Sequence, residues 1–221
     1  MQLSSLAESQ GGCPIKGRAY EATLDALATI ERSNVATFLT QWFAFSTSVP
    51  VILCIAAEKA SCELERKNIV TNLHSELGLD TDGPSHPALL SDLIEKATGT
   101  VPSPDFVSNG THVFLKDLKN MMRDGSPAFN AGVMLALEAV AYDILSILKE
   151  ILVKSGNNAL VQHPYITIHE EVEADHIDNT EENIALHKDN VIDVNKGFTE
   201  MNALWRTFWS DAFLLLVTRH V

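Results

Sequence analysis

Apolar residues recur at spacings of three and four along most of this chain, the pattern of helices with one buried face. The first such segment covers about 20–47. Pro50 predicts a break or kink, because proline lacks the amide that a helix interior needs. A second segment covers about 51–77, with Gly78 as a candidate C-cap. Further helices are predicted over 86–97, 113–122, 127–153, 165–178, 181–190 and 194–218.

Turn-forming residues separate these segments, and none of them shows the strict alternation of a strand. The pattern therefore predicts an all-α fold, a bundle of about seven or eight helices around one core. The chain has 221 residues, which suits a single domain. We assign that domain to 18–221 and treat 1–17, which contain glycine and proline, as a loose N-terminal lead.

The amino-acid composition excludes some classes of binding partner. The formal net charge is −13, so phosphate backbones and anionic lipid surfaces would repel the chain, and neither a nucleic-acid nor a membrane partner is expected. The longest apolar run, 49–57, is too short to span a bilayer, and no secretory signal is visible. Cys13, Cys54 and Cys62 form no CxxC pair, which favours a reducing, cytoplasmic location.

The clearest local pattern for chemistry lies in the segment 169–176. At about 100° per residue, offsets of four and seven return to nearly the same helix face. His169, Glu173 and His176 therefore form one stripe of two imidazoles and a carboxylate. The stripe fits a metal site, but a polar surface face on an acidic helix would have the same pattern.

Glu138 is a lone carboxylate within the apolar run 133–141. Burial of a charged carboxylate is costly unless it is paired, protonated or bound to a metal. An exposed position on an amphipathic helix is the alternative. Apolar residues surround it on most sides of the helix, which favours a functional role.

Glu76 and His86 flank the predicted turn at 79–85. Glu76 ends one helix and His86 opens the next, so both side chains can face one cavity. His74 competes for the first position, and His86 could also be an ordinary first-turn residue.

These residues together are three carboxylates and three imidazoles. Mixed nitrogen and oxygen ligands suit iron or manganese in oxygen chemistry, whereas structural zinc prefers a closed tetrahedral site. Helical bundles are a common scaffold for carboxylate-bridged di-metal centres. Ferritin-like sites, however, carry two Glu-x-x-His motifs, and this sequence has neither.

At these positions the sequence resembles the haem-oxygenase-like di-iron oxidases over about residues 20–215. That family has a Glu and a His on its first core segment, a Glu on a second helix and a His-x3-Asp/Glu-x2-His triplet on a third. Glu173 stands where many members carry Asp, which lengthens one ligand arm. The matching positions here are Glu76, His86, Glu138, His169, Glu173 and His176.

The resemblance implies two iron ions per chain, the second one labile, and dioxygen as cosubstrate, reduced to a peroxo-diferric species. It also implies oxidation of a small amino-acid-derived substrate in natural-product biosynthesis, by C–C cleavage, N-oxygenation, desaturation or nitrile formation, and a homodimer. It assigns no catalytic residue beyond the metal ligands. The alternatives are oxidative decarboxylation of a fatty-acid-type substrate, and a metal-free, thiaminase-like hydrolase of the same fold, which would need a catalytic cysteine.

The substrate pocket is expected beside the metals. Tyr142, Trp205 and Phe208 are candidate substrate-binding residues, together with the neighbouring Trp209, although packing in the core would also explain these aromatic side chains. A substrate carboxylate would need a basic partner. The candidates for that role are Arg18, Lys59, Arg66 and Arg206.

Overall fold

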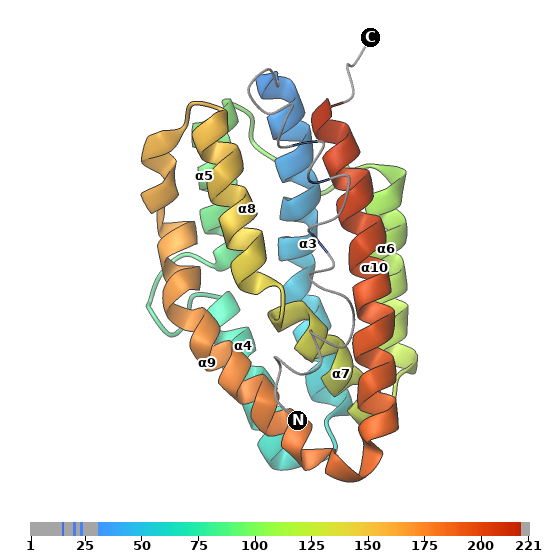
Figure 1. Ribbon diagram of the computed structural model, residues 1–221. Coiled ribbons are helices and arrows are strands. Elements are labelled where there is room, and N and C mark those ends of the chain that lie inside the picture. Colours follow the sequence, from blue (N-terminus) through green and yellow to red (C-terminus); the bar gives the residue numbers. More distant parts are fainter. Residues whose placement is uncertain (1–14, 16–19, 21–22, 24–30, 218–221) are drawn as a thin grey trace.

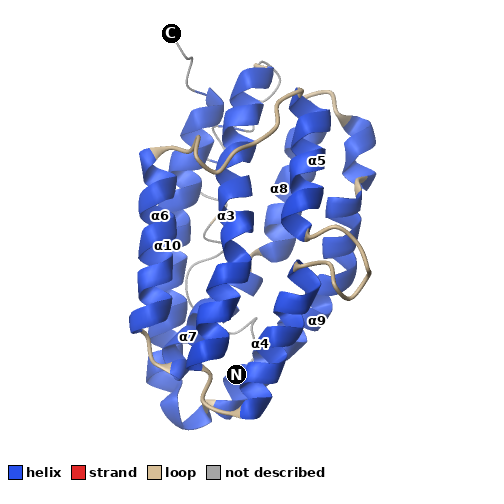
Figure 2. Cartoon of the chain, turned by 180° about the vertical axis from the view of Figure 1, so that it is seen from behind, coloured by secondary structure: helices blue, strands red, loops and turns tan. Residues whose placement is uncertain are grey.

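The computed structural model describes residues 15, 20, 23 and 31–217, apart from the side chain of Glu173. The proposed boundary at residue 17 and the expected helix start at residue 20 therefore fall among residues that are mostly outside this description. The described part consists of helices joined by loops and turns, without a strand, as Figure 2 shows. The expected all-α fold is confirmed.

The α-helices pack together into a single bundle. α3 runs through the middle of the molecule, with α6 and α10 along one side of it and α5, α8 and α9 along the other (Figure 1). The helices are α3 (Arg32–Lys59), α4 (Glu63–Glu76), α5 (His86–Thr98), α6 (Asn109–Asp124), α7 (Pro127–Glu138), α8 (Ala141–Lys154), α9 (Pro164–Leu186) and α10 (Val191–Val217). The short 3₁₀ helices η2 (Asn158–Gln162) and η3 (Lys188–Asn190) precede α9 and α10.

The prediction that Pro50 breaks the first helix is wrong. α3 continues through Pro50 to Lys59, because Ser48, Ile52 and Leu53 around it are buried and their packing offsets one lost backbone bond. The chain breaks instead before α4. There the Glu65 carboxylate accepts hydrogen bonds from the amide (2.6 Å) and the hydroxyl (2.7 Å) of Ser61 and so fixes the turn.

The predicted helix over 127–153 is two helices in the structure. α7 ends at Glu138, and α8 begins at Ala141 after a turn at Ala139 and Val140. Neither proline nor glycine marks this turn, so the local sequence contains no breaker that could have predicted it. The segments 165–178 and 181–190, expected to be separate, form the single helix α9 followed by η3.

Two helical stretches, Arg32–Lys59 and Pro127–Lys154, have the length and hydropathy of a membrane-spanning helix. Inside the bundle, 72% and 61% of their most apolar windows are buried. This burial is typical of the core helices of a helical bundle.

Candidate metal centre

A turn after α4 brings Glu76 and His86 together. Gly78 has a φ of +72° and closes α4 with a Schellman pattern, in which the Leu79 amide donates to the His74 carbonyl. A Cβ at Gly78 would lie 2.5 Å from the Pro84 carbonyl oxygen, so only glycine fits. The prediction of Gly78 as the helix stop is therefore confirmed. α5 then starts directly at His86.

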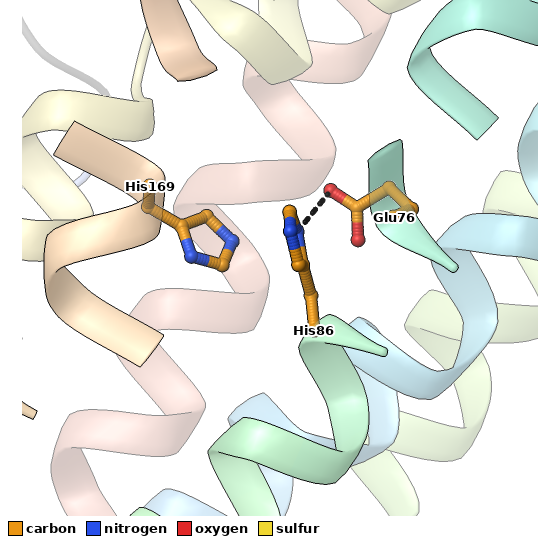
Figure 3. Close-up of side chains that lie close together, drawn as sticks. All are labelled: Glu76, His86 and His169. Carbon is orange, nitrogen blue, oxygen red and sulfur yellow. Dashed lines mark ion pairs between the residues drawn. The ribbon is translucent and has the colours of Figure 1, made fainter. Parts of the chain in front are cut away.

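Glu76, His86 and His169 form a compact cluster (Figure 3). Their candidate ligand atoms all lie within 4.8 Å of one another. His86 Nδ1 lies 3.3 Å from Glu76 Oε1, and the rings of His86 and His169 are 4.5 Å apart between centroids. Three helices thus supply the cluster: α4 ends at Glu76, α5 begins at His86, and α9 carries His169.

Several nitrogen atoms of this cluster lack a hydrogen-bond partner. His86 is completely buried, and neither of its ring nitrogens makes a hydrogen bond with any described residue. The Nε2 atom of His176, which is also buried, has none either. An unsatisfied buried polar group typically costs about 1–3 kcal/mol. Unpaired imidazole nitrogens beside a carboxylate are the donor set that a transition metal takes, so these residues fit a metal ion.

His169 is oriented for ligation by its own helix. Its Nδ1 lies 2.6 Å from the backbone carbonyl oxygen of Tyr165, so Nδ1 carries the hydrogen and Nε2 keeps its lone pair. Burial lowers the pKa of His169 to about 4 and also lowers the pKa of His176. Both imidazoles are therefore neutral at pH 7, which is the form that binds metals.

The two described carboxylates differ in protonation. Burial, followed by the negative charge of Glu76, raises the pKa of Glu138 to about 8. Burial alone would also raise the pKa of Glu76. The contact of the Glu76 carboxylate with the His86 ring at 3.3 Å and its electrostatic interactions with His86, His169 and His176 outweigh burial and lower this pKa. At pH 7 the site thus holds one ionised carboxylate and one that is mostly protonated.

Three further polar residues near the predicted ligands have different surroundings. The side chain of Glu173 lies outside the described residues, although α9 carries its backbone between His169 and His176. Glu170 is exposed and pairs with Lys149, as expected for a charge on the solvent face. His74, the competitor of Glu76, is also exposed.

A cavity of about 80 Å³ adjoins the cluster. Its polar end is formed by Asn72, Glu76, Glu138, His169 and His176. The rest is largely apolar and aromatic, and no Lys or Arg of the described chain lines it. The other lining residues are Trp42, Phe45, Ser46, Val49, Ile52, Leu53, Met134, Leu137, Ala141, Ile144, Leu145, Tyr165 and Trp205.

Of the four aromatic residues expected at the pocket, the structure brings one to it. Trp205 lines the cavity, whereas Phe208 is buried against Phe114 and Trp209 and does not. Trp209 is likewise buried outside the lining. Tyr142 is 50% exposed. It lies on α8, which starts after the turn that follows Glu138, so its side chain no longer shares a helix face with Glu138.

The expected basic partners do not reach the cavity either. Lys59 donates to the Arg123 carbonyl, and Arg66 contacts Glu63 and the Ala57 carbonyl. Arg206 is exposed, and Arg18 lies outside the described residues.

Tyr165 and Trp42 lie at the site but were not predicted from the sequence. The Tyr165 ring lies 4.3 Å from that of His169, and its hydroxyl accepts a hydrogen bond from Trp42 Nε1 at 3.0 Å. Tyr165 stands one turn before His169, so its place on the ligand stripe was a usable signal. Nothing in the sequence connects Trp42 to this site.

α4 and α9 are held together beyond the cluster by what we call the polar seam: three successive side-chain contacts between the two helices. Asn179 Nδ2 donates to Asn72 Oδ1 at 2.8 Å. One turn further, Asn68 Nδ2 donates to Glu182 (2.7 Å) and Asn183 (3.0 Å). At the far end, His187 Nε2 lies 2.8 Å from Glu65 Oε1, with both residues buried.

No family model matches this chain, and no curated protein is detectably similar to it. Solved structures are similar in fold. A CADD-like protein of unknown function from Nostoc punctiforme superposes with a TM-score of 0.86 at 17% identity, over 97% of this chain and 96% of that one.

Two TenA-type structures are also similar. A TenA homolog from Pseudomonas syringae has a TM-score of 0.66 at 13% identity, over 96% of this chain and 91% of that one. A TenA family transcription regulator from Silicibacter has a TM-score of 0.64 at 12% identity, over 96% of each chain. These likenesses show that the chain has the haem-oxygenase-like all-α fold. At such low identity they show the fold alone.

Proposed function

We propose that this protein is a non-haem di-iron oxidase that uses dioxygen to oxidise a small substrate held in the cavity. The observation that carries the proposal is the buried group of Glu76, His86 and His169, whose candidate ligand atoms converge while neither ring nitrogen of His86 makes a hydrogen bond with a described residue. A bundle core that leaves imidazoles unpaired beside carboxylates is better explained by metal binding than by packing.

His176, Glu138 and Glu173 complete the proposed ligand set. His176 and Glu138 line the same cavity as Glu76, and each interacts electrostatically with Glu76. Glu173 shares the helix face of His169 and His176. Two iron ions bound by these residues would supply the redox chemistry with dioxygen.

The chain's own groups prepare and enclose that centre. The Tyr165 carbonyl holds His169 in the tautomer with a free Nε2. Glu138 loses its proton when it becomes a ligand. The apolar walls restrict bulk water, which strengthens electrostatic interactions inside the cavity.

The cavity favours a substrate with an apolar body. Lys and Arg are absent from the described lining, so a carboxylate there would have a cationic partner only in the bound metals. The ammonium group of a free amino acid would also have no carboxylate partner, because the only carboxylates in the described lining are Glu76 and Glu138, which we assign to the metals. The lining therefore favours a fatty-acid-type or other apolar substrate over the amino-acid-derived one.

The metal-free hydrolase is less well supported. Cys54 and Cys62 are both exposed, and neither lines the cavity. A hydrolase that depends on a cysteine would need its thiol within reach of a bound substrate.

The test is anaerobic addition of ferrous iron, followed by mixing with oxygen, monitored by stopped-flow absorbance and Mössbauer spectroscopy. We expect about two irons per chain and a transient visible band. His86→Ala and His176→Ala should lose iron binding, whereas His74→Ala, an exposed histidine on the same helix as Glu76, should behave as the wild type. Failure of the wild-type chain to bind iron, or iron binding by both variants at the wild-type level, would contradict the proposal.

A further inference from the structure

Ser46 is a polar residue on the apolar side of the cavity. It lies on α3 among Trp42, Phe45 and Val49, which line the same wall. Ser46 is only 5% exposed, and its hydroxyl makes no hydrogen bond with any described residue. Its hydroxyl oxygen is not among the completely enclosed polar atoms without a partner, so it is accessible from the cavity that Ser46 lines.

The neighbouring hydroxyls behave differently. Thr47 and Ser48 both donate to the Ala44 carbonyl, at 2.9 and 3.0 Å, which is the usual arrangement for such residues inside a helix. Neither residue lines the cavity. Among these three adjacent hydroxyls, only that of Ser46 remains open to a ligand.

Pro50 leaves a second acceptor at the same place. In a regular helix the carbonyl of Ser46 would accept from the amide four residues later, but Pro50 has no amide hydrogen. Residues four apart lie on nearly the same helix face, so this gap in the bonding pattern is on the side of α3 that faces the cavity. α3 nevertheless continues as a helix through this position.

Every other polar side chain in the described lining already has a partner or a proposed role. Asn72 accepts from Asn179, and Tyr165 accepts from Trp42. Trp205 Nε1 donates to the Ala136 carbonyl. The remaining four, which we assign to the metals, are Glu76, Glu138, His169 and His176.

We propose that Ser46 is a substrate-binding residue, which uses its hydroxyl and its Pro50-freed carbonyl to bind a hydroxyl or amine group on an otherwise apolar substrate. The inference rests on the proposed function and narrows its substrate class. A site built to hydrogen-bond such a group discriminates strongly against analogues that lack it, because its own polar atoms are then left unpaired.

The test compares two probes that differ by one hydroxyl, p-cresol and toluene. Their binding to the full-length, EDTA-treated chain is measured by calorimetry and by quenching of tryptophan fluorescence, since Trp42 and Trp205 line the cavity. Without metal, the phenol oxygen has no iron to bind. We expect p-cresol to bind about fivefold more tightly than toluene, the ratio for a net hydrogen bond of roughly 1 kcal/mol.

The phenol can donate its one hydrogen to the Ser46 carbonyl while its oxygen accepts from the Ser46 hydroxyl. Two variants remove these two partners separately. Ser46→Ala deletes the hydroxyl, and Pro50→Ala restores the amide that pairs with the Ser46 carbonyl. Each should reduce the preference for p-cresol while leaving toluene affinity nearly unchanged. Ser48→Ala, which removes a hydroxyl outside the cavity, is the matched control and should keep the wild-type ratio. Far-ultraviolet circular dichroism establishes that each variant is folded.

The outcomes separate this inference from the proposed function. Equal affinity of the wild type for both probes, binding of neither, or a wild-type ratio in either Ser46→Ala or Pro50→Ala would overturn the role of Ser46. Iron titration of the wild-type chain tests the metal centre independently, because the probe measurements use no metal.

Discussion

His169 is held by the residue one turn before it: its Nδ1 lies 2.6 Å from the carbonyl oxygen of Tyr165. Most metal-binding histidines are oriented by a hydrogen bond from the second ring nitrogen. Here the orienting partner is the backbone of the same helix, so the tautomer of His169 is set as soon as α9 forms. His86 has no such partner, and its behaviour in the absence of metal should differ.

We predict that His86→Leu abolishes metal binding without destabilising the metal-free protein. Removing this imidazole relieves the desolvation of two ring nitrogens that make no hydrogen bond and loses only the 3.3 Å contact with Glu76, so the free energy of unfolding should change by no more than about 1 kcal/mol. Urea unfolding of the EDTA-treated proteins measures this. Leu90→Ala, which truncates a fully buried side chain on the same helix, should lower stability by roughly 2–5 kcal/mol. A comparable loss in His86→Leu would show that His86 has a structural role.

Glu138 should make the metal-free protein less stable as pH rises. Its pKa is raised from 4.5 to about 8, so the folded state holds a proton that the unfolded state has already released. The stabilisation is complete below pH 4.5 and is lost as pH rises towards 8, with a limiting slope of about 1.4 kcal/mol per pH unit. Glu138→Gln cannot ionise, so the difference in unfolding free energy between variant and wild type should grow in favour of the variant across this window. A difference independent of pH would refute the raised pKa.

Metal uptake should release the proton of Glu138. At pH 7 the other described ligands are ready to bind, since Glu76 is ionised and His169 is neutral. Binding of zinc, a redox-inactive substitute for iron, should therefore release about one proton per chain at pH 7 and much less at pH 9. A pH indicator in weakly buffered solution detects the release, and Glu138→Gln should abolish it. Equal release at both pH values would argue against Glu138 as a ligand.

Gly78→Ala should damage both stability and the site. The substitution places a Cβ 2.5 Å from the Pro84 carbonyl oxygen and adds the strain of a φ of +72°. Gly99→Ala is the matched control, because its φ is +75° but its Cβ would meet nothing within 4 Å. We expect Gly99→Ala to lose about 1 kcal/mol in thermal unfolding and Gly78→Ala clearly more. Gly78→Ala should also weaken zinc binding, since this turn sets Glu76 against His86.

Local sequence patterns were sufficient to predict the fold class and to predict that several of the candidate ligands lie close together. The spacing of His169 and His176 on one helix face, and of Glu76 and His86 around a glycine-closed turn, depends only on helix periodicity and turn chemistry. The structure brings these residues to one place.

The errors come from tertiary effects. The chain between 133 and 153 contains neither proline nor glycine, so the turn after Glu138 had no local signal, and Tyr142 was assigned to the wrong face. Pro50 is the opposite case. The sequence predicted a helix break there, but the buried residues before and after Pro50 keep α3 continuous. The sequence could not predict whether a basic residue lies at the cavity. Long exposed side chains pair with groups far away in the sequence, and helix periodicity does not predict those contacts.

The polar seam determines how α4 and α9 can move relative to each other. Apolar helix faces can slide by small amounts, because one methyl group replaces another at little cost. The seam contacts at Asn72, Asn68 and Glu65 recur every three or four residues along α4. Their partners, Asn179, Asn183 and His187, recur every four residues along α9 and its C-cap, so any partial shift would unpair all of them together. The two helices can therefore pack only in certain discrete positions along their axes, in which all the seam contacts are made together. A deletion or insertion of one residue in α9 between His176 and Asn179 would keep the seam intact and rotate the histidines by about a quarter turn away from Glu76.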